Sequence, residues 1–141
     1  MAKSKTAHGI FTPEHPEKII GKAVIEYRSS WELRAFITLD RSPNVIKWAS
    51  ESIEIPYYDP VTKKHRTYYP DLLIFYKDKF GKEKAAIFEI KPLSQSIMEK
   101  AKTKYDQLQL VTNMAKWRAA ESYCKKAGIT FRVITEKDLF F

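Results

Sequence analysis

The chain is poor in cysteine and has no long apolar run. Cys124 is the only cysteine among 141 residues, which excludes a disulfide framework and a cysteine-based zinc site and is typical of a reducing compartment. No apolar run reaches the ~18 residues that a membrane-spanning helix needs. The first five residues also lack the apolar segment of a signal peptide. We therefore expect a cytoplasmic protein with no membrane partner.

Positive charge, in contrast, is in excess. The sequence has 25 Lys and Arg against 17 Asp and Glu, which gives a formal net charge of +8. This balance favours a polyanionic partner such as nucleic acid, although a basic solvated surface is also common in small proteins. The apolar fraction of 44% is typical of a globular chain, and the length fits one domain.

Residues 1–22 carry several lysines and show no helical or strand period. We expect a basic N-terminal arm here, either flexible or irregular, followed by one folded domain over residues 23–141. Such an arm would touch a phosphate backbone if it had a function. A frayed end without a function is the favoured interpretation of residues 1–10.

The first helix of the domain is marked by its cap. Ser29 can serve as the N-cap with Glu32 at the third helical position, which is a capping box. Apolar residues from Trp31 to Leu39 recur at helical spacing, and residues 42–44 end the helix.

Alternating or continuous apolar residues predict four strands. The expected ranges are residues 45–55, 66–76, 84–91 and 129–135. Short loops make the first three strands antiparallel, and a helical crossover returns the fourth strand parallel to a neighbour. The predicted fold class is α/β, with a mixed central sheet flanked by helices.

The crossover itself is predicted to be helical in two pieces. Met98, Ala101, Tyr105 and Leu108 are spaced for one face of the first piece. Thr112 or Asn113 is a candidate N-cap for the second piece, which Gly128 is well placed to end.

Asp71 and the triplet Glu89-Ile90-Lys91 are the most informative residues of the chain. Glu89 and Lys91 share one face of their strand, and antiparallel pairing with the strand of Asp71 brings the three polar groups together. Two adjacent carboxylates repel unless a cation lies between them, and oxygen ligands suit a hard ion such as Mg²⁺. Phosphodiester hydrolysis uses such a set, whereas a solvated hairpin explains each motif taken alone.

These residues resemble the PD-(D/E)xK nuclease superfamily. Glu32 on a helix, Asp71 after Pro70, and Glu89-Ile90-Lys91 follow in the order of its restriction-endonuclease-like αβββαβ core. Longer stretches between Tyr27 and Leu139 are similar to the head completion nuclease family of tailed phages. They are Tyr27 to Glu32, Asn44 to Glu51, Ile55 to Tyr58, Arg66 to Asp71, Phe88 to Pro92, Lys116 to Ala120 and Gly128 to Arg132.

The resemblance implies a role for each catalytic position. Asp71 and Glu89 would bind Mg²⁺, with Mn²⁺ as a substitute and the Ile90 carbonyl as a further ligand. Lys91 would hold or activate the attacking water. Glu32 would bind a metal ion or orient the water, although the capping box explains this residue without any chemistry. Glu51 is a weaker candidate for the edge of the site.

Several basic residues are candidates for phosphate contacts, although a solvated side chain is the simpler interpretation of any single one. They are Arg28, Lys47, Lys100, Lys104, Lys116 and Arg118. The tyrosines at 57, 58, 68 and 69 either line a DNA groove or pack on the sheet.

The sequence therefore predicts a Mg²⁺-dependent DNA endonuclease that processes DNA at the filled phage head. Head or neck proteins would be its partners, and the host cytoplasm or the virion its location. Two alternatives stay open. One is a transposon end-cleaving endonuclease or Holliday-junction resolvase of the same fold, and the other is a non-catalytic DNA-binding virion protein. The oligomeric state is not determined by the sequence.

Overall fold

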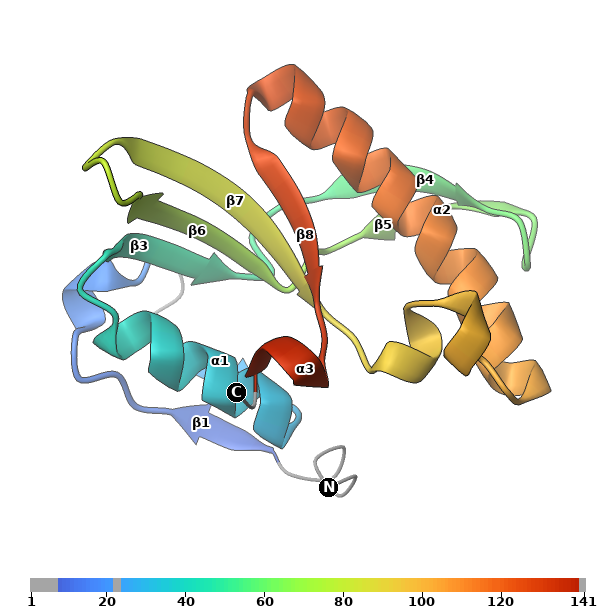
Figure 1. The fold of residues 1–141 in the computed structure, drawn as a ribbon, viewed down its shortest axis with the longest axis horizontal. Helices are drawn as coiled ribbons and strands as arrows, with labels where there is room; N and C mark the ends of the chain where they lie inside the picture. The colour runs from blue at the N-terminus through green and yellow to red at the C-terminus, as the bar shows by residue number, and fades with distance from the viewer. Residues whose placement is uncertain (1–7, 22–23, 140–141) are drawn as a thin grey trace.

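The computed structural model describes residues 8–21 and 24–139 (Figure 1). Its central feature is a four-stranded mixed sheet. In spatial order its strands are β3 (Val45–Ser50), β6 (Leu72–Lys77), β7 (Glu83–Ile90) and β8 (Thr130–Ile134). The first two neighbouring pairs are antiparallel and the β7–β8 pair is parallel, as predicted. The predicted α/β class is confirmed.

Helix α1 (Ser30–Arg41) packs on β3 and closes the larger apolar core. The rings of Phe36 and Trp48 stack with their centroids 5.2 Å apart, and both side chains are fully buried. Ser29 Oγ accepts a hydrogen bond from the Glu32 N–H at 3.1 Å, so the predicted N-cap is confirmed.

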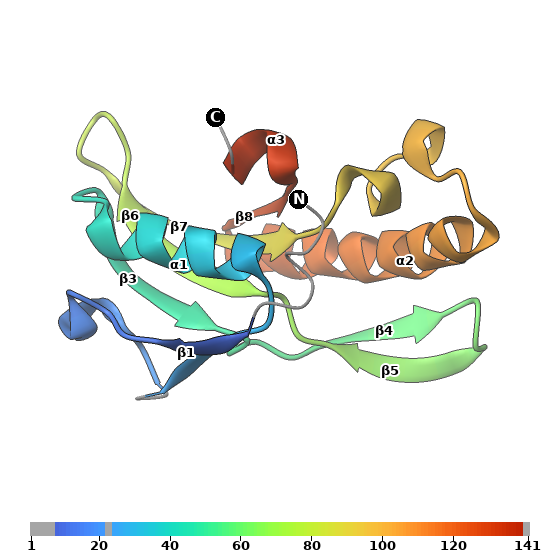
Figure 2. The ribbon, with the colours of Figure 1, turned by 90° about the horizontal axis from the view of Figure 1, so that it is seen from below.

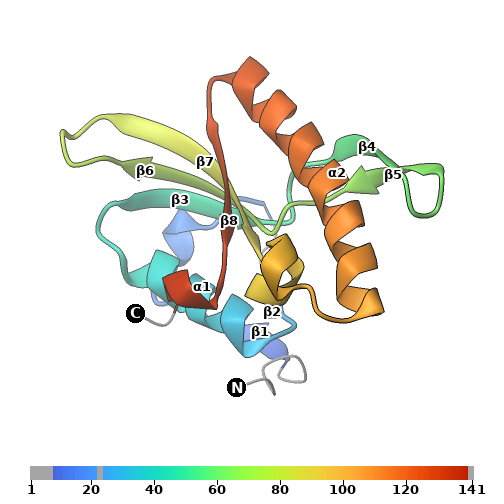
Figure 3. The same ribbon diagram turned by 45° about the vertical axis from the view of Figure 1, so that its right-hand side comes forward.

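A two-stranded hairpin interrupts the sequence between β3 and β6. Its strands are β4 (Ile55–Asp59) and β5 (Lys64–Tyr68), and they form a separate sheet (Figures 1 and 3). Both predicted ranges are therefore wrong in extent. The strand predicted over 45–55 ends at Ser50, and the range 66–76 is divided between β5 and β6. The chain leaves the main sheet at Glu51, whose φ of +51° ends β3, and it re-enters after Pro70, which has no N–H for pairing.

Helix α2 (Lys104–Ala127) covers this hairpin and also contacts β8 (Figures 2 and 3). Ala120 of α2 packs with Tyr57 and Tyr68 of the hairpin in a second apolar cluster. Asp59 fastens the hairpin turn to the helix, because its carboxylate accepts hydrogen bonds from the Val61 N–H and from the hydroxyls of Thr62 and Thr112.

The crossover is one long helix rather than two pieces. Thr103 is its N-cap, accepting a hydrogen bond from the Asp106 N–H, so Thr112 and Asn113 are not caps. Asn113 is buried within the helix and donates to the Gln95 carbonyl at 3.3 Å. Gly128 ends the helix with a φ of +74°, as predicted.

The predicted apolar face of the first piece is also wrong. Of this face only Ala101 is buried, whereas Met98 and Tyr105 are mostly exposed. The four residues do not share one helix, because Met98 lies in a short 3₁₀ turn and Tyr105 in α2. The 3₁₀ turns between β7 and α2 are η3 (Leu93–Gln95) and η4 (Met98–Lys100).

Residues 8–21 pack against the domain. Strand β1 (Gly9–Phe11) pairs with β2 (Ile25–Tyr27), and a 3₁₀ turn, η2 (Pro16–Lys18), follows β1. The buried Asp40 carboxylate of α1 accepts hydrogen bonds from the N–H groups of Glu14 and His15.

The Lys18 ammonium donates to the Leu39, Asp40 and Ser42 carbonyls at the end of α1. Residues 1–7 and 22 of the predicted arm lie outside the described residues, and the division of the chain at residue 22 stays a prediction. At the other end of the chain, β8 leads into a short helix, α3 (Glu136–Leu139), which contacts α1. Within the described residues, no helix is long and apolar enough to cross a membrane.

Candidate active site

Asp71 and Glu89 lie together at one end of the central sheet. Asp71 immediately precedes β6, Glu89 is close to the end of β7, and the two strands are paired through Leu72 and Phe88. The Asp71 N–H donates to Glu89 Oε1 at 3.2 Å, and the Ile90 N–H donates to Asp71 Oδ2 at 2.7 Å. Each carboxylate is thus held by the backbone of the neighbouring strand.

The two carboxylates differ in exposure, because Glu89 is buried and Asp71 is half-buried. Glu89 is only 4% exposed. Burial and the nearby charge of Glu89 raise the pKa of Asp71 well above its usual range. Burial also raises the pKa of Glu89, although the charge of Lys91 and the hydrogen bond from Tyr68 oppose the shift. The pair is electrostatically unfavourable in its ionised form, and a cation between the two groups would relieve this.

Lys91 and Tyr68 both contact Glu89. Lys91 Nζ lies 3.6 Å from Glu89 Oε2, and the Tyr68 hydroxyl donates to Glu89 Oε1 at 2.7 Å. Burial, followed by the charge of Glu89, raises the pKa of Tyr68, so its phenol stays protonated and keeps donating. Tyr68 was predicted only as one of several tyrosines in a groove or a packed sheet. Its position before Pro70-Asp71 is the one signal in the sequence that links it to the site.

Lys116 reaches the site from α2. Its Nζ lies 5.6 Å from the centroid of the Tyr68 ring and 5.9 Å from that of Tyr57. Burial lowers the pKa of Lys116, and the positive charge of Lys91 acts in the same direction while Glu89 opposes it. A second cation therefore lies near the acidic pair, and α2 carries it.

Glu32 lies at the N-terminal end of α1, which is turned toward the end of β7 (Figures 1 and 2). Its Oε1 accepts a hydrogen bond from the Arg28 N–H at 2.6 Å, and its charge contributes to the raised pKa of Asp71. Glu32 is thus both part of a cap and close to the acidic pair.

The carboxylates do not form a complete metal cage by themselves. Across residues 8–21 and 24–139, no three Asp, Glu, His or Cys side chains converge closely enough to hold a metal ion. Asp71 and Glu89 converge as a pair, and their oxygen donors and unfavourable ionisation fit a hard divalent cation. Glu32 is near this pair without completing a three-carboxylate set.

The candidate phosphate contacts divide into two groups. Arg28 and Lys116 lie beside the acidic pair. Lys47 instead donates to the Glu17 carbonyl at 3.2 Å, and the other three residues are exposed. These three are Lys100, Lys104 and Arg118.

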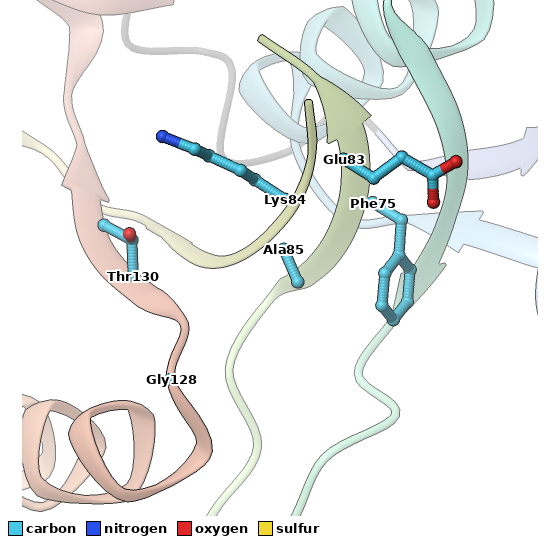
Figure 4. A pocket seen from close by; sticks show the side chains of 6 residues that line it. All are labelled: Phe75, Glu83, Lys84, Ala85, Gly128 and Thr130. Carbon is cyan, nitrogen blue, oxygen red and sulfur yellow. The ribbon is translucent and has the colours of Figure 1, made fainter. Parts of the chain in front are cut away.

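A separate hollow lies at the opposite end of the sheet, where β7 begins and Gly128 leads into β8 (Figure 4). Glu83 and Lys84 line it, and their side chains point in different directions. Since it contains no facing carboxylates, it has no counterpart of the Asp71–Glu89 pair.

A mixed sheet flanked by helices, with an acidic pair and a lysine at the ends of two central strands, defines a nuclease of the restriction-endonuclease-like fold. The family model of the TnsA-like endonuclease N-terminal domain matches residues 42–136, and the chain belongs to this family. It is an endonuclease. The chain is also 35% identical over 142 aligned residues to the head completion nuclease of Enterobacteria phage T4, an alignment that covers 93% of this chain and 92% of that protein.

Proposed function

We propose that this endonuclease hydrolyses DNA phosphodiester bonds with the help of a divalent metal ion, and that Asp71, Glu89 and Lys91 are its catalytic residues. The observation that carries the proposal is the pair of carboxylates at the ends of β6 and β7. Each accepts a hydrogen bond from a backbone N–H on the neighbouring segment, and burial raises the pKa of both. A protein does not gain stability from such a pair unless a cation compensates it.

Asp71 and Glu89, with the Ile90 carbonyl, are the proposed ligands, and Glu32 would contribute from α1. A bound divalent ion, Mg²⁺ with Mn²⁺ as a substitute, would make hydroxide available near neutral pH and would neutralise charge on the phosphate.

The remaining roles belong to side chains that already contact the pair. Lys91 is close enough to Glu89 to be held in place by it, and its free N–H groups would orient the attacking water or bind a phosphate oxygen. Tyr68 would keep Glu89 Oε1 in one orientation. Lys116 and Arg28 would bind the DNA phosphates on either side of the site.

We further propose that the protein acts in phage head completion, because its relative from phage T4 is a head completion nuclease that aligns along nearly its whole length. It would process DNA at the filled head, with head or neck proteins as partners, in the host cytoplasm or on the virion. Cleavage of transposon ends is the second candidate, and the TnsA-like family model favours it.

Cleavage of supercoiled plasmid tests the nuclease proposal. We expect nicking or linearisation with Mg²⁺ or Mn²⁺, none in EDTA, and none with Asp71→Asn or Lys91→Ala. Lys82→Ala, at the distant β6–β7 turn, is the matched lysine control and should cut like the wild type. Uncut plasmid with the wild-type protein, at concentrations that bind DNA, would contradict the proposal. A linear DNA with transposon ends, compared with the same length of random sequence, distinguishes the second candidate by a preference for the ends.

A further inference from the structure

Arg28 and Glu51 form an ion pair at the edge of the acidic site. Arg28 follows β2, Glu51 follows β3, and an Arg28 guanidinium nitrogen contacts a Glu51 carboxylate oxygen. The same nitrogen lies 3.9 Å from Glu32 Oε2. The Arg28 side chain is nevertheless 57% exposed, so part of its guanidinium faces solvent. The pair lines a hollow of about 270 Å³ between these segments.

Glu51 adopts a backbone conformation that glutamate rarely adopts. Its φ is +51°, in the left-handed region that favours glycine or asparagine. The Glu51 N–H donates to the Asp71 carbonyl at 3.0 Å, which fixes this unusual residue next to the acidic pair. The turn itself would be less strained with glycine, so the backbone gives no reason for a glutamate here. Strain of this kind is concentrated at functional sites.

The side chain of Glu51 has one clear effect, which is on Arg28. The hydrogen bond between Arg28 and Glu51 raises the pKa of Arg28. Burial of Arg28 acts against this rise in pKa, whereas the charges of Glu51, Glu32 and Asp71 increase it. Arginine has five N–H donors in a planar fork, so a guanidinium that is held by a carboxylate on one edge can still bind a phosphate on another.

We propose that Glu51 is a positioning residue that holds Arg28 at the mouth of the Asp71–Glu89 site, where Arg28 binds the DNA phosphate next to the bond that is cut. The proposal rests on the proposed nuclease function and specifies how that site binds its substrate. It predicts that removal of a negative charge weakens DNA binding. A simple charge argument predicts the opposite, because the variant protein is more basic.

Duplex binding in EDTA tests the proposal without any cleavage. We would measure the Kd of a fluorescein-labelled DNA duplex by fluorescence anisotropy for the full chain. Arg28→Ala and Glu51→Gln should each weaken binding about tenfold, which corresponds to about 1.4 kcal/mol. Glu54→Gln is the matched control: this exposed glutamate of the same loop carries the same charge, and its removal should leave binding unchanged or slightly tighter.

Two further variants separate positioning from a structural role. Glu51→Gly relieves the backbone strain, so its Tm should be unchanged or higher while its DNA binding is weakened as in Glu51→Gln. In the Arg28→Ala protein, Glu51→Gln should cause no additional loss, since there is no guanidinium left to position.

Some outcomes would overturn the proposal. One is a Glu51→Gln protein that binds the duplex as well as the wild type does, and another is an equal further loss in the Arg28→Ala background. A third is unchanged binding in EDTA with a higher Mg²⁺ requirement for plasmid cleavage, which would assign Glu51 to the metal ion instead. The nuclease proposal itself would fail only if the wild-type protein left plasmid uncut.

Discussion

Replacing Asp71 by asparagine should abolish cleavage and at the same time stabilise the metal-free protein. Burial and repulsion by the charge of Glu89 both raise the pKa of Asp71 well above its usual range. A raised pKa in the folded state means that ionisation costs stability as the pH rises from the unfolded value of about 3.9 to the folded value. Asparagine is never ionised and keeps an oxygen that can accept the hydrogen bond from the Ile90 N–H.

The expected gain is about 1–2 kcal/mol, which is the usual size of a single stabilising change. An unfolding entropy of about 2.1 cal/mol/K per residue gives about 0.3 kcal/mol/K for a chain of this length, so the Tm should rise by about 3–7 °C at pH 7 in EDTA. The difference should disappear below about pH 3, where the carboxyl is protonated in both states.

Thermal unfolding with and without Mg²⁺ checks this expectation. Mg²⁺ should raise the Tm of the wild type and leave that of Asp71→Asn unchanged. Glu89→Gln is an informative companion, because glutamine keeps the acceptor oxygen for Tyr68 but loses the ion pair with Lys91, so its gain should be smaller. A lower Tm for Asp71→Asn at pH 7 in EDTA would refute the reasoning, since the buried charge would then be stabilising.

Three further substitutions test other parts of the structure. Tyr68→Phe should reduce kcat about tenfold with little change in KM, because it removes one of the hydrogen bonds that orient Glu89, and steady-state cleavage measures this. Asp59→Asn should lower the free energy of unfolding by about 1–3 kcal/mol in denaturant at pH 7. Burial alone would raise the pKa of Asp59, but the hydrogen bonds that it accepts outweigh burial and lower this pKa. The stability lost in Asp59→Asn should therefore become smaller as the pH falls from the unfolded-state pKa of about 3.9 through the lower pKa of the folded state. Gly128→Ala should cost about 1 kcal/mol by thermal unfolding, from its φ of +74° alone, since an added Cβ meets no atom within 4 Å.

The parts of the fold that were predicted correctly are those set by local chemistry. The cap at Ser29 and the glycine after α2 act within a few residues, and the apolar run before Glu89 marks a buried strand wherever it lies in the sheet. The parallel return of β8 followed from the helical crossover before it.

The wrong predictions concern strand and helix boundaries that are decided by contacts with residues far away in the sequence. Ile53 and Ile55 alternate around Glu54 like the end of a strand that begins at residue 45. Ile55 instead begins β4 and is buried in the cluster beneath α2 rather than in the main sheet. Asn113 resembles a cap in the sequence but lies inside α2, where its side-chain nitrogen donates to the Gln95 carbonyl. In each case a partner from a remote part of the chain decides the outcome.

The same distinction applies to the candidate site. Asp71, Glu89 and Lys91 were found because two strand ends must meet when a short turn joins the strands. The contacts of Tyr68 and Lys116 depend on how the hairpin and α2 pack together. The sequence gives one signal for Tyr68, its position before Pro70-Asp71, and no spacing that places Lys116 next to it.

The acidic pair lies where the two apolar clusters of the protein meet, and this position makes the site sensitive to both. Ile90, next to Glu89, belongs to the core beneath α1, whereas Tyr68, which donates to Glu89, belongs to the cluster beneath α2. A change in how α2 packs on the hairpin would therefore move Tyr68 and Lys116 relative to Glu89 without unfolding the central sheet. The two carboxylates can be held close together because hydrogen bonds from groups packed in both apolar clusters converge on them. Looser packing of either cluster should therefore reduce activity before it reduces stability.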